Sequence, residues 1–154
     1  MRVQTSDRAS LGRLDPSRRL HTQGDPLTDQ AGSIIALDDL DHSRHSHEFV
    51  GAEHGDVPFS IILVHSEPGV GPKLHRHPYP EVFIVHSGQA TFQLGDASIV
   101  VDEGHVVVGP PDVPHGFTNT GQGELLLTAI HGAPRFLTEW LAGPDPAWTS
   151  KPDE

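Results

Sequence analysis

Cysteine is absent from the 154-residue sequence. This absence excludes disulfide bridges, iron–sulfur clusters, thiolate zinc sites and a cysteine nucleophile. Long hydrophobic runs are missing too, since no apolar stretch approaches the roughly 18 residues that a membrane-spanning helix needs. The first 30 residues carry arginines but not the apolar segment of a secretory signal. We therefore expect a cytoplasmic protein.

Basic residues are scarce: 10 Lys and Arg stand against 21 Asp and Glu, a formal net charge of −11. Such a chain is poorly suited to phosphate backbones or anionic lipids, so we expect no nucleic-acid partner and no membrane partner. Half of the basic residues fall within positions 1–19, a stretch with few large apolar side chains. We predict that residues 1–31 form a disordered N-terminal arm.

Helical periodicity is rare in the rest of the chain, and short apolar runs separated by Gly- and Pro-rich turns dominate. This spacing is typical of an all-β sandwich or barrel, and we assign it to one domain over residues 32–142. The expected strands are Ser33–Leu37, Val57–His65, Glu81–His86, Ala90–Leu94, Ser98–Asp102, His105–Val108 and Glu124–His131.

One segment, Arg135–Ala142, has apolar residues at helical spacing. We predict a short C-terminal helix there, with one apolar face on the barrel. Pro144 and Pro146 end it, because proline cannot continue a helix. Residues 143–154 then form a C-terminal tail.

Histidine is abundant, at 12 of 154 residues. His75 and His77 are two positions apart, so on a strand both side chains point to one face. Glu81 follows four residues after His77, and His115 follows a proline-rich turn farther along the chain. Imidazoles and a carboxylate that converge in this way are typical of a mixed nitrogen and oxygen metal site.

Two sequence motifs contain these residues. The first, G-x5-H-x-H-x3-E-x6-G, runs from Gly69 to Gly88, and the second, G-x5-P-x-G-x2-H-x3-N, from Gly104 to Asn119. Asp112 replaces the middle glycine of the second motif, and Asp tolerates turn conformations. Over residues 48–131 the sequence resembles the cupins.

The resemblance implies a double-stranded β-helix, the jelly-roll barrel of the cupins. It also implies one divalent metal ion held by His75, His77, Glu81 and His115. Four protein ligands leave two adjacent positions of an octahedron open. Fe(II) and Mn(II) are favoured, with Ni, Co, Cu and Zn as alternatives. Small cupins also suggest a homodimer, in which we expect Ser33–Leu37 to add to a sheet edge.

The favoured function is dioxygenase-type oxidation of a small organic molecule at this metal. Two alternatives stay open: a metal-dependent isomerase or decarboxylase, and a cupin that binds a sugar or metabolite without turning it over. Tyr79 and His131 are the candidate catalytic residues. Gln93 and Thr128 are polar strand residues that we expect to meet a substrate. The histidine-rich segment at residues 42–47 is interpreted as a solvated linker, with a surface metal site as the alternative.

Overall fold

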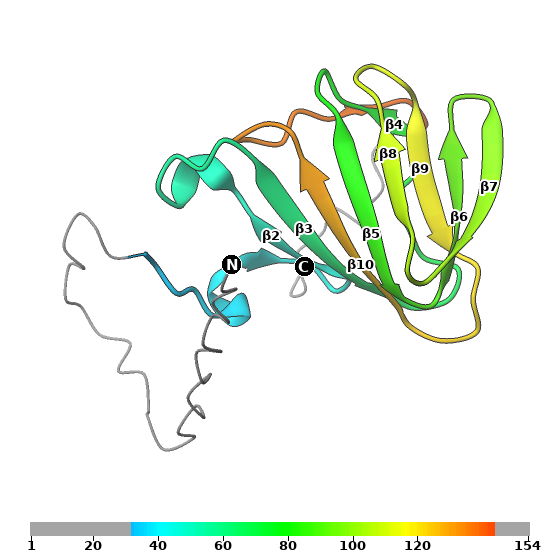
Figure 1. Ribbon diagram of the computed structural model, residues 1–154, viewed down its shortest axis with the longest axis horizontal. Coiled ribbons are helices and arrows are strands. Elements are labelled where there is room, and N and C mark those ends of the chain that lie inside the picture. Colours follow the sequence, from blue (N-terminus) through cyan, green and yellow to red (C-terminus); the bar gives the residue numbers. More distant parts are fainter. Residues whose placement is uncertain (1–31, 144–154) are drawn as a thin grey trace, which may run out of the picture. The chain divides into compact units, whose positions relative to one another are not determined.

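The computed structural model describes residues 32–143 (Figure 1). The predicted arm, residues 1–31, and residues 144–154 of the predicted tail lie outside the described residues. From Ile35 onward the described residues belong to one compact unit. Within this part of the chain no helix is long and apolar enough to cross a membrane. The compartment itself stays a prediction.

Strands β1, β2, β3, β10, β5 and β8 form a six-stranded sheet in that order, and all neighbours are antiparallel. Their bounds are β1 (Asp41–His42), β2 (Ser46–Phe49), β3 (Ser60–Ser66), β10 (Leu125–His131), β5 (Glu81–Ser87) and β8 (Val106–Gly109). Two 3-10 turns, η1 (Leu37–Asp39) and η2 (Gly51–Glu53), flank β1 and β2.

A second sheet of five strands has the order β11, β4, β9, β6, β7. Its strands are β11 (Glu139–Trp140), β4 (His75–Arg76), β9 (His115–Asn119), β6 (Gln89–Leu94) and β7 (Ala97–Asp102). The chain crosses repeatedly between the two sheets, as in a jelly roll (Figure 1). The predicted all-β, two-sheet fold is confirmed.

The hydrophobic core lies between the inner faces of the two sheets. Phe83 of β5 meets Phe92 of β6 with ring centroids 5.1 Å apart, and Phe92 meets Phe117 of β9 at 5.3 Å. All three rings are at most 4% exposed, and burial of each contributes about 2–3 kcal/mol to stability. Alternation on β5 places Phe83, Val85 and Glu81 on this inner face, as the sequence predicted.

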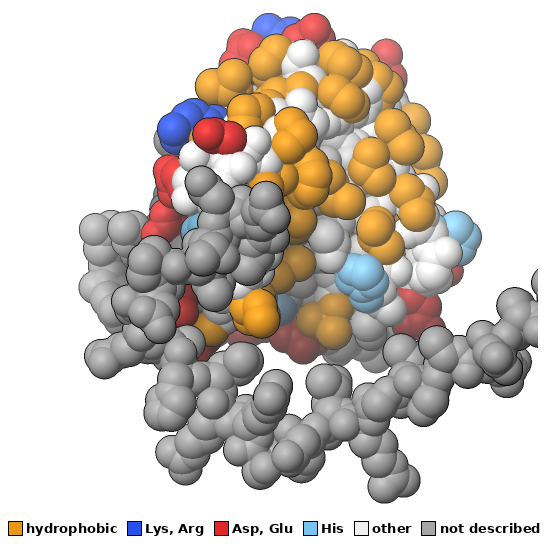
Figure 2. Space-filling view, turned by 60° about the vertical axis from the view of Figure 1, so that its left-hand side comes forward, with side chains coloured by type: hydrophobic (Ala, Val, Ile, Leu, Met, Phe, Trp, Pro, Cys, Tyr) orange, Lys and Arg blue, Asp and Glu red, His pale blue; other side chains and the backbone are white. Residues whose placement is uncertain are grey.

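The outer face of the six-stranded sheet is also apolar. Val106 and Val108 of β8 are 62% and 56% exposed, and Leu126 of β10 is 39% exposed. Figure 2 shows hydrophobic side chains gathered over one broad face with few charged groups among them. β8 is an edge strand of its sheet, and within residues 32–143 no further strand pairs with its outer side.

Two motif positions adopt left-handed backbone conformations. Gly88, between β5 and β6, has φ +89°, and a Cβ there would lie 2.8 Å from the carbonyl oxygen of Glu124. Asp112 has φ +62°. Because aspartate visits this region more readily than most residues, it replaces the glycine of the second motif without disturbing the turn.

The predicted C-terminal helix is wrong. Residues 135–142 contain no helix, and Glu139–Trp140 pair with β4 as strand β11. The backbone groups of this strap (residues 136–141) find partners outside the segment instead of within a helix. The amide of Leu137 donates to the hydroxyl of Tyr79 at 3.0 Å, and that of Leu141 donates to the carbonyl of Leu74 at 3.0 Å.

Two predictions near the start of the domain need correction. Ser33–Leu37 forms no strand within the described part of a single chain and runs into the 3-10 turn η1; its pairing with the sheet edge of a partner chain stays a prediction. The histidine-rich segment is not a solvated linker but the hairpin of β1 and β2, closed by a 2.9 Å hydrogen bond between the hydroxyls of Ser43 and Ser46. This hairpin extends the six-stranded sheet beside β3.

Candidate metal centre

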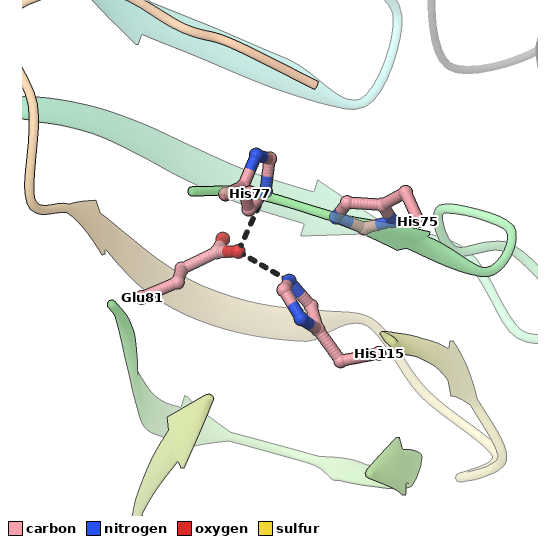
Figure 3. A group of neighbouring side chains, drawn as sticks. All are labelled: His75, His77, Glu81 and His115. Carbon is pink, nitrogen blue, oxygen red and sulfur yellow. Dashed lines mark hydrogen bonds and ion pairs between the residues drawn. The ribbon is translucent and has the colours of Figure 1, made fainter. Parts of the chain in front are cut away.

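The four predicted metal ligands come from three strands that meet at one end of the barrel (Figure 3). His75 lies in β4 and His77 directly after it, while Glu81 begins β5 and His115 begins β9. His75 and His115 are directly paired across β4 and β9. All four side chains belong to residues that are at most 5% exposed.

One ligand atom from each of these four residues lies within 4.8 Å of the others. Oε2 of Glu81 lies 2.7 Å from Nε2 of His115 and 3.1 Å from Nε2 of His77. Figure 3 shows the carboxylate facing both rings, with His75 on the same side. The sequence motif therefore becomes a single buried cluster of three imidazoles and one carboxylate.

The Nε2 atoms of the ligand histidines face the cluster, and a backbone carbonyl near Nδ1 orients each ring. Nδ1 of His75 lies 2.6 Å from the carbonyl oxygen of Lys73, Nδ1 of His77 lies 2.8 Å from that of Leu137, and Nδ1 of His115 lies 2.9 Å from that of Val113. A carbonyl only accepts, so Nδ1 carries the proton. The Nε2 lone pairs then face the centre of the cluster, as in metal-binding histidines.

The donor set fits a divalent metal ion. Nε2 of His77 and Nε2 of His131 are buried and lack a hydrogen-bond partner of acceptable geometry, although each lies within about 3.1 Å of a Glu81 oxygen. A buried nitrogen without a partner is costly, and a cation at the centre of the cluster removes that cost at His77. Three imidazoles with one carboxylate suit the borderline divalent metals.

The pKa shifts of His75 and Glu81 favour the forms that bind a metal ion, whereas contact with Glu81 raises the pKa of His115, so a metal ion would have to displace its proton. Burial lowers the pKa of the His75 imidazole to about 4. Burial opposes the ionised form of Glu81, but its contacts with His115, His131 and His77 outweigh this and hold the carboxyl pKa well below its usual range. At neutral pH, Glu81 is therefore a carboxylate and His75 a neutral imidazole, the forms that bind metals.

The structure also places Tyr79 and His131 beside the cluster. His131 of β10 is directly paired with Glu81 of β5, and its Nε2 lies 3.0 Å from Oε1 of the carboxylate. The Tyr79 hydroxyl lies 3.4 Å from Nδ1 of His131. Both residues are buried, and His131 contacts the Glu81 oxygen that does not face His115.

A cavity of about 280 Å³ opens onto the metal ligands. Besides His75, His77, Glu81 and His131, its lining comprises Glu48, Ile62, Val64, Pro72, Phe117, Ala129, Phe136, Thr138 and Trp140. Glu48 was not among the predicted site residues, because the segment at residues 42–47 directly before it was interpreted as a linker. Phe136, Thr138 and Trp140 were not predicted to line a pocket, because residues 135–142 were predicted to form a helix.

Two residues expected to meet a substrate do not line this cavity. Thr128 points to the outer face of its sheet, where its hydroxyl lies 2.7 Å from Nε2 of His86. Gln93 donates to the carbonyl of Gly95 at 2.8 Å. Both lie on strands as predicted, but alternation carries their side chains away from the metal ligands.

Comparison with known proteins agrees with the geometry. The Cupin domain family matches residues 62–131, a range that contains all four metal-ligand candidates. Protein SchB of Streptomyces halstedii is 31% identical over 121 residues, which cover 71% of this chain and 85% of SchB. The chain belongs to the cupin family.

Solved structures resemble this cupin in fold. Oxalate decarboxylase from Bacillus subtilis matches with a TM-score of 0.60 and 21% identity over 68% of the chain. The cupin spans only 30% of the length of that enzyme. A conserved protein with a double-stranded β-helix domain from Klebsiella pneumoniae matches with a TM-score of 0.54 and 18% identity, covering 71% of this chain and 96% of that one. At these identities the likeness concerns the fold alone.

Proposed function

We propose that this cupin holds one divalent metal ion through His75, His77, Glu81 and His115 and carries out dioxygenase-type oxidation of a small organic molecule. One observation carries the proposal: three Nε2 lone pairs and one carboxylate oxygen converge in a buried cluster at the end of a mostly apolar cavity. Fe(II) or Mn(II) is favoured because both are redox-active and accept this donor set.

The metal ion, when bound, would supply two adjacent coordination positions and a path for electrons between substrate and dioxygen. The protein's own residues supply the setting. Val64, Ala129 and Phe117 give the cavity apolar walls. Trp140, whose ring centroid lies 4.9 Å from that of His75, covers the ligands from the strap. An apolar cavity suits both dioxygen and a planar organic substrate.

The proposed reaction is the cleavage of an enediol or catechol-type substrate. The carbon–carbon bond between the two hydroxylated carbons breaks, and each of these carbons gains one oxygen atom of dioxygen. Each carbon ends as a carboxylic acid group, so both atoms of dioxygen enter the product. Dioxygen is the oxidant and accepts the four electrons that the substrate loses.

Tyr79 and His131 are proposed to act together on Glu81. When the Tyr79 hydroxyl donates to Nδ1 of His131, the imidazole carries its proton on Nε2, which faces Oε1 of Glu81. This holds Oε1 and leaves Oε2 for the metal ion. The same two residues offer a proton at the edge of the cavity, the role expected of a catalytic acid or base.

A homodimer is proposed through the outer face of the six-stranded sheet. Val106, Val108 and Leu126 leave this face apolar and exposed, and within the described part of the chain no strand pairs with the outer side of β8. A second copy of the chain would cover both features at once. An apolar contact also avoids bringing acidic surfaces of a chain with net charge −11 together.

Metal content tests the proposed function first. The protein is purified without a nickel column or chelator and analysed by elemental mass spectrometry beside a His75→Ala/His115→Ala variant. One equivalent of iron or manganese per chain, absent from the variant, supports the proposal. Zinc in a closed site, or no metal, shifts the function to structural or binding roles.

Substrate oxidation is the second test. The metal-loaded protein is incubated with catechol-type compounds and isotopically labelled dioxygen, and products are analysed by mass spectrometry. Incorporation of both labelled atoms supports the dioxygenase. Binding that raises the melting temperature without any product supports the alternative of a metabolite-binding cupin.

A further inference from the structure

Glu48 contributes a second acidic group to the cavity, separate from the metal cluster. It lies on β2, directly opposite Asp41 of β1 and Ile62 of β3. Its side chain lines the cavity together with Ile62 and with the metal-ligand candidates His75 and Glu81. The metal centre is complete without Glu48, so this carboxyl is available for another role.

The carboxyl of Glu48 has no partner among residues 32–143. None of the ion pairs and none of the side-chain hydrogen bonds in this part of the chain involves it. Burial raises its pKa, and the like charge of Asp41 raises it further. Glu48 is half-buried, so a carboxyl without a partner among residues 32–143 costs some stability there. Groups of this kind at a cavity wall are candidates for ligand recognition.

Strand order sets the distance between Glu48 and the metal centre. β3 lies between β2 and β10, and β10 carries His131 next to the cluster. With strands about 4.8 Å apart, the backbone at Glu48 lies roughly 10 Å from β10. The cavity of about 280 Å³, which Glu48 lines together with His75 and Glu81, has room for one small molecule.

The remaining walls restrict what that molecule can be. Phe117, Phe136 and Trp140 present aromatic surfaces, and no Lys or Arg lines the cavity within the described part of the chain. An anionic group near Glu48 would be repelled without compensation. A neutral hydroxyl would instead donate a hydrogen bond to the carboxylate.

We infer that Glu48 is a specificity-determining residue, which accepts a hydrogen bond from a hydroxyl group on a neutral, planar substrate whose opposite end meets the metal ion. This inference rests on the proposed function, because the metal ion holds the other end of the molecule. The expected substrate is a diol that carries a further hydroxyl group, and not a carboxylate, at the end opposite the metal ion.

Three related probes test the inference by calorimetry on the metal-loaded, full-length protein without dioxygen. They are 4-(hydroxymethyl)catechol, 4-ethylcatechol and 3,4-dihydroxybenzoate, which carry a hydroxyl, an apolar group and a carboxylate at the far end. The variants are Glu48→Leu and Glu48→Gln. Glu103→Gln is the control, because Glu103 is exposed in the turn between β7 and β8, far from the cavity lining.

We expect Glu48→Leu to weaken binding of the hydroxymethyl probe about 10-fold, since hydrogen bonds to charged groups contribute this much. Binding of the ethyl probe should stay within about twofold in every variant. Glu48→Gln should strengthen binding of 3,4-dihydroxybenzoate, because it removes the repulsion between the two carboxylates. This result does not depend on whether the Glu48→Leu variant folds. Glu103→Gln should change nothing.

The outcomes separate the two proposals. If the wild type binds 4-ethylcatechol but both Glu48 variants leave all three affinities unchanged, the role of Glu48 is overturned and the diol-binding metal site stands. If none of the probes binds the metal-loaded wild type, the proposed diol chemistry is overturned, and the inference about Glu48 falls with it.

Discussion

Glu81 and His131 face each other from directly paired positions on β5 and β10, with Oε1 of the carboxylate 3.0 Å from Nε2 of the imidazole. His131 thus contacts the oxygen of Glu81 that is turned away from His115, whose Nε2 lies 2.7 Å from Oε2. The carboxylate has an imidazole nitrogen close to each of its two oxygens. Its orientation toward the metal position therefore depends on a residue outside the ligand set.

Replacing His131 should weaken metal binding without unfolding the barrel. We expect His131→Leu to raise the metal dissociation constant about 10- to 100-fold, the usual cost of losing such an outer partner. His131→Gln places an amide near the position of Nε2 and should recover part of the affinity. Competition with a chromogenic chelator measures both values. Equal affinities in wild type and His131→Leu would show that Glu81 needs no support from β10.

Metal removal should lower the thermal stability. The ion binds the folded cluster and not the unfolded chain, so at about 1,000 times its dissociation constant it adds about 4 kcal/mol to the free energy of unfolding. Differential scanning calorimetry with and without a chelator measures the change. The His75→Ala/His115→Ala variant, which lacks two ligands, should melt at the same temperature in both conditions. An identical shift in that variant would assign the effect to the chelator.

Acid should release the metal ion in a defined range. Burial opposes protonation of His115, but the hydrogen bond and charge of Glu81 and the Val113 carbonyl outweigh it and raise its pKa above the ordinary 6.5. Its proton competes with the metal ion as soon as the pH falls below neutrality. His75, with a pKa of about 4, adds its competition only in stronger acid. Release should therefore begin above pH 6 and be complete near pH 4.

Equilibrium dialysis at about pH 7.5, 6, 5 and 4, followed by elemental analysis, tests this range. Circular dichroism of each sample shows whether the barrel is still folded. A full equivalent of metal retained at the lowest pH would contradict the assigned histidine ligands.

Gly88 and Gly104 form a matched pair for a stability test. Both have positive φ, +89° and +81°, but only at Gly88 would a Cβ meet a neighbouring atom, the Glu124 carbonyl oxygen at 2.8 Å. Gly104→Ala should cost about 1–2 kcal/mol for its backbone conformation. Gly88→Ala should cost more, because the turn must also shift. Urea unfolding measures both, and equal costs would mean that the turn after β5 moves freely.

The proposed dimer predicts a mass of two chains by light scattering at micromolar concentration. Val106→Glu/Val108→Glu introduces charge on β8 and should yield monomers with an unchanged circular dichroism spectrum. Val100→Glu is the control, because Val100 is equally exposed, at 60%, but lies on β7 of the other sheet. A monomeric wild type, or equal effects of both changes, would argue against an interface at β8.

The metal ligands were predictable from the sequence because their arrangement is largely local. His75 and His77 share a face through strand alternation, and Glu81 starts the next strand four residues later. His115 was predicted as a ligand only because it belongs to the second sequence motif. The core residue Phe83 followed from the same alternation, counted from Glu81.

The tertiary structure alone decided what surrounds those ligands. His131 lies opposite Glu81 because β10 pairs with β5 in a particular register. Glu48 lines the cavity because β2 pairs with β3. No local sequence pattern encodes these pairings. The spacing of Phe136 and Trp140 favoured a helix. The strap forms no helix, because the His77 imidazole, the Tyr79 hydroxyl and strand β4 bind its backbone groups. Local sequence determined which atoms can bind a metal ion, and long-range hydrogen bonding determined which residues stand around it.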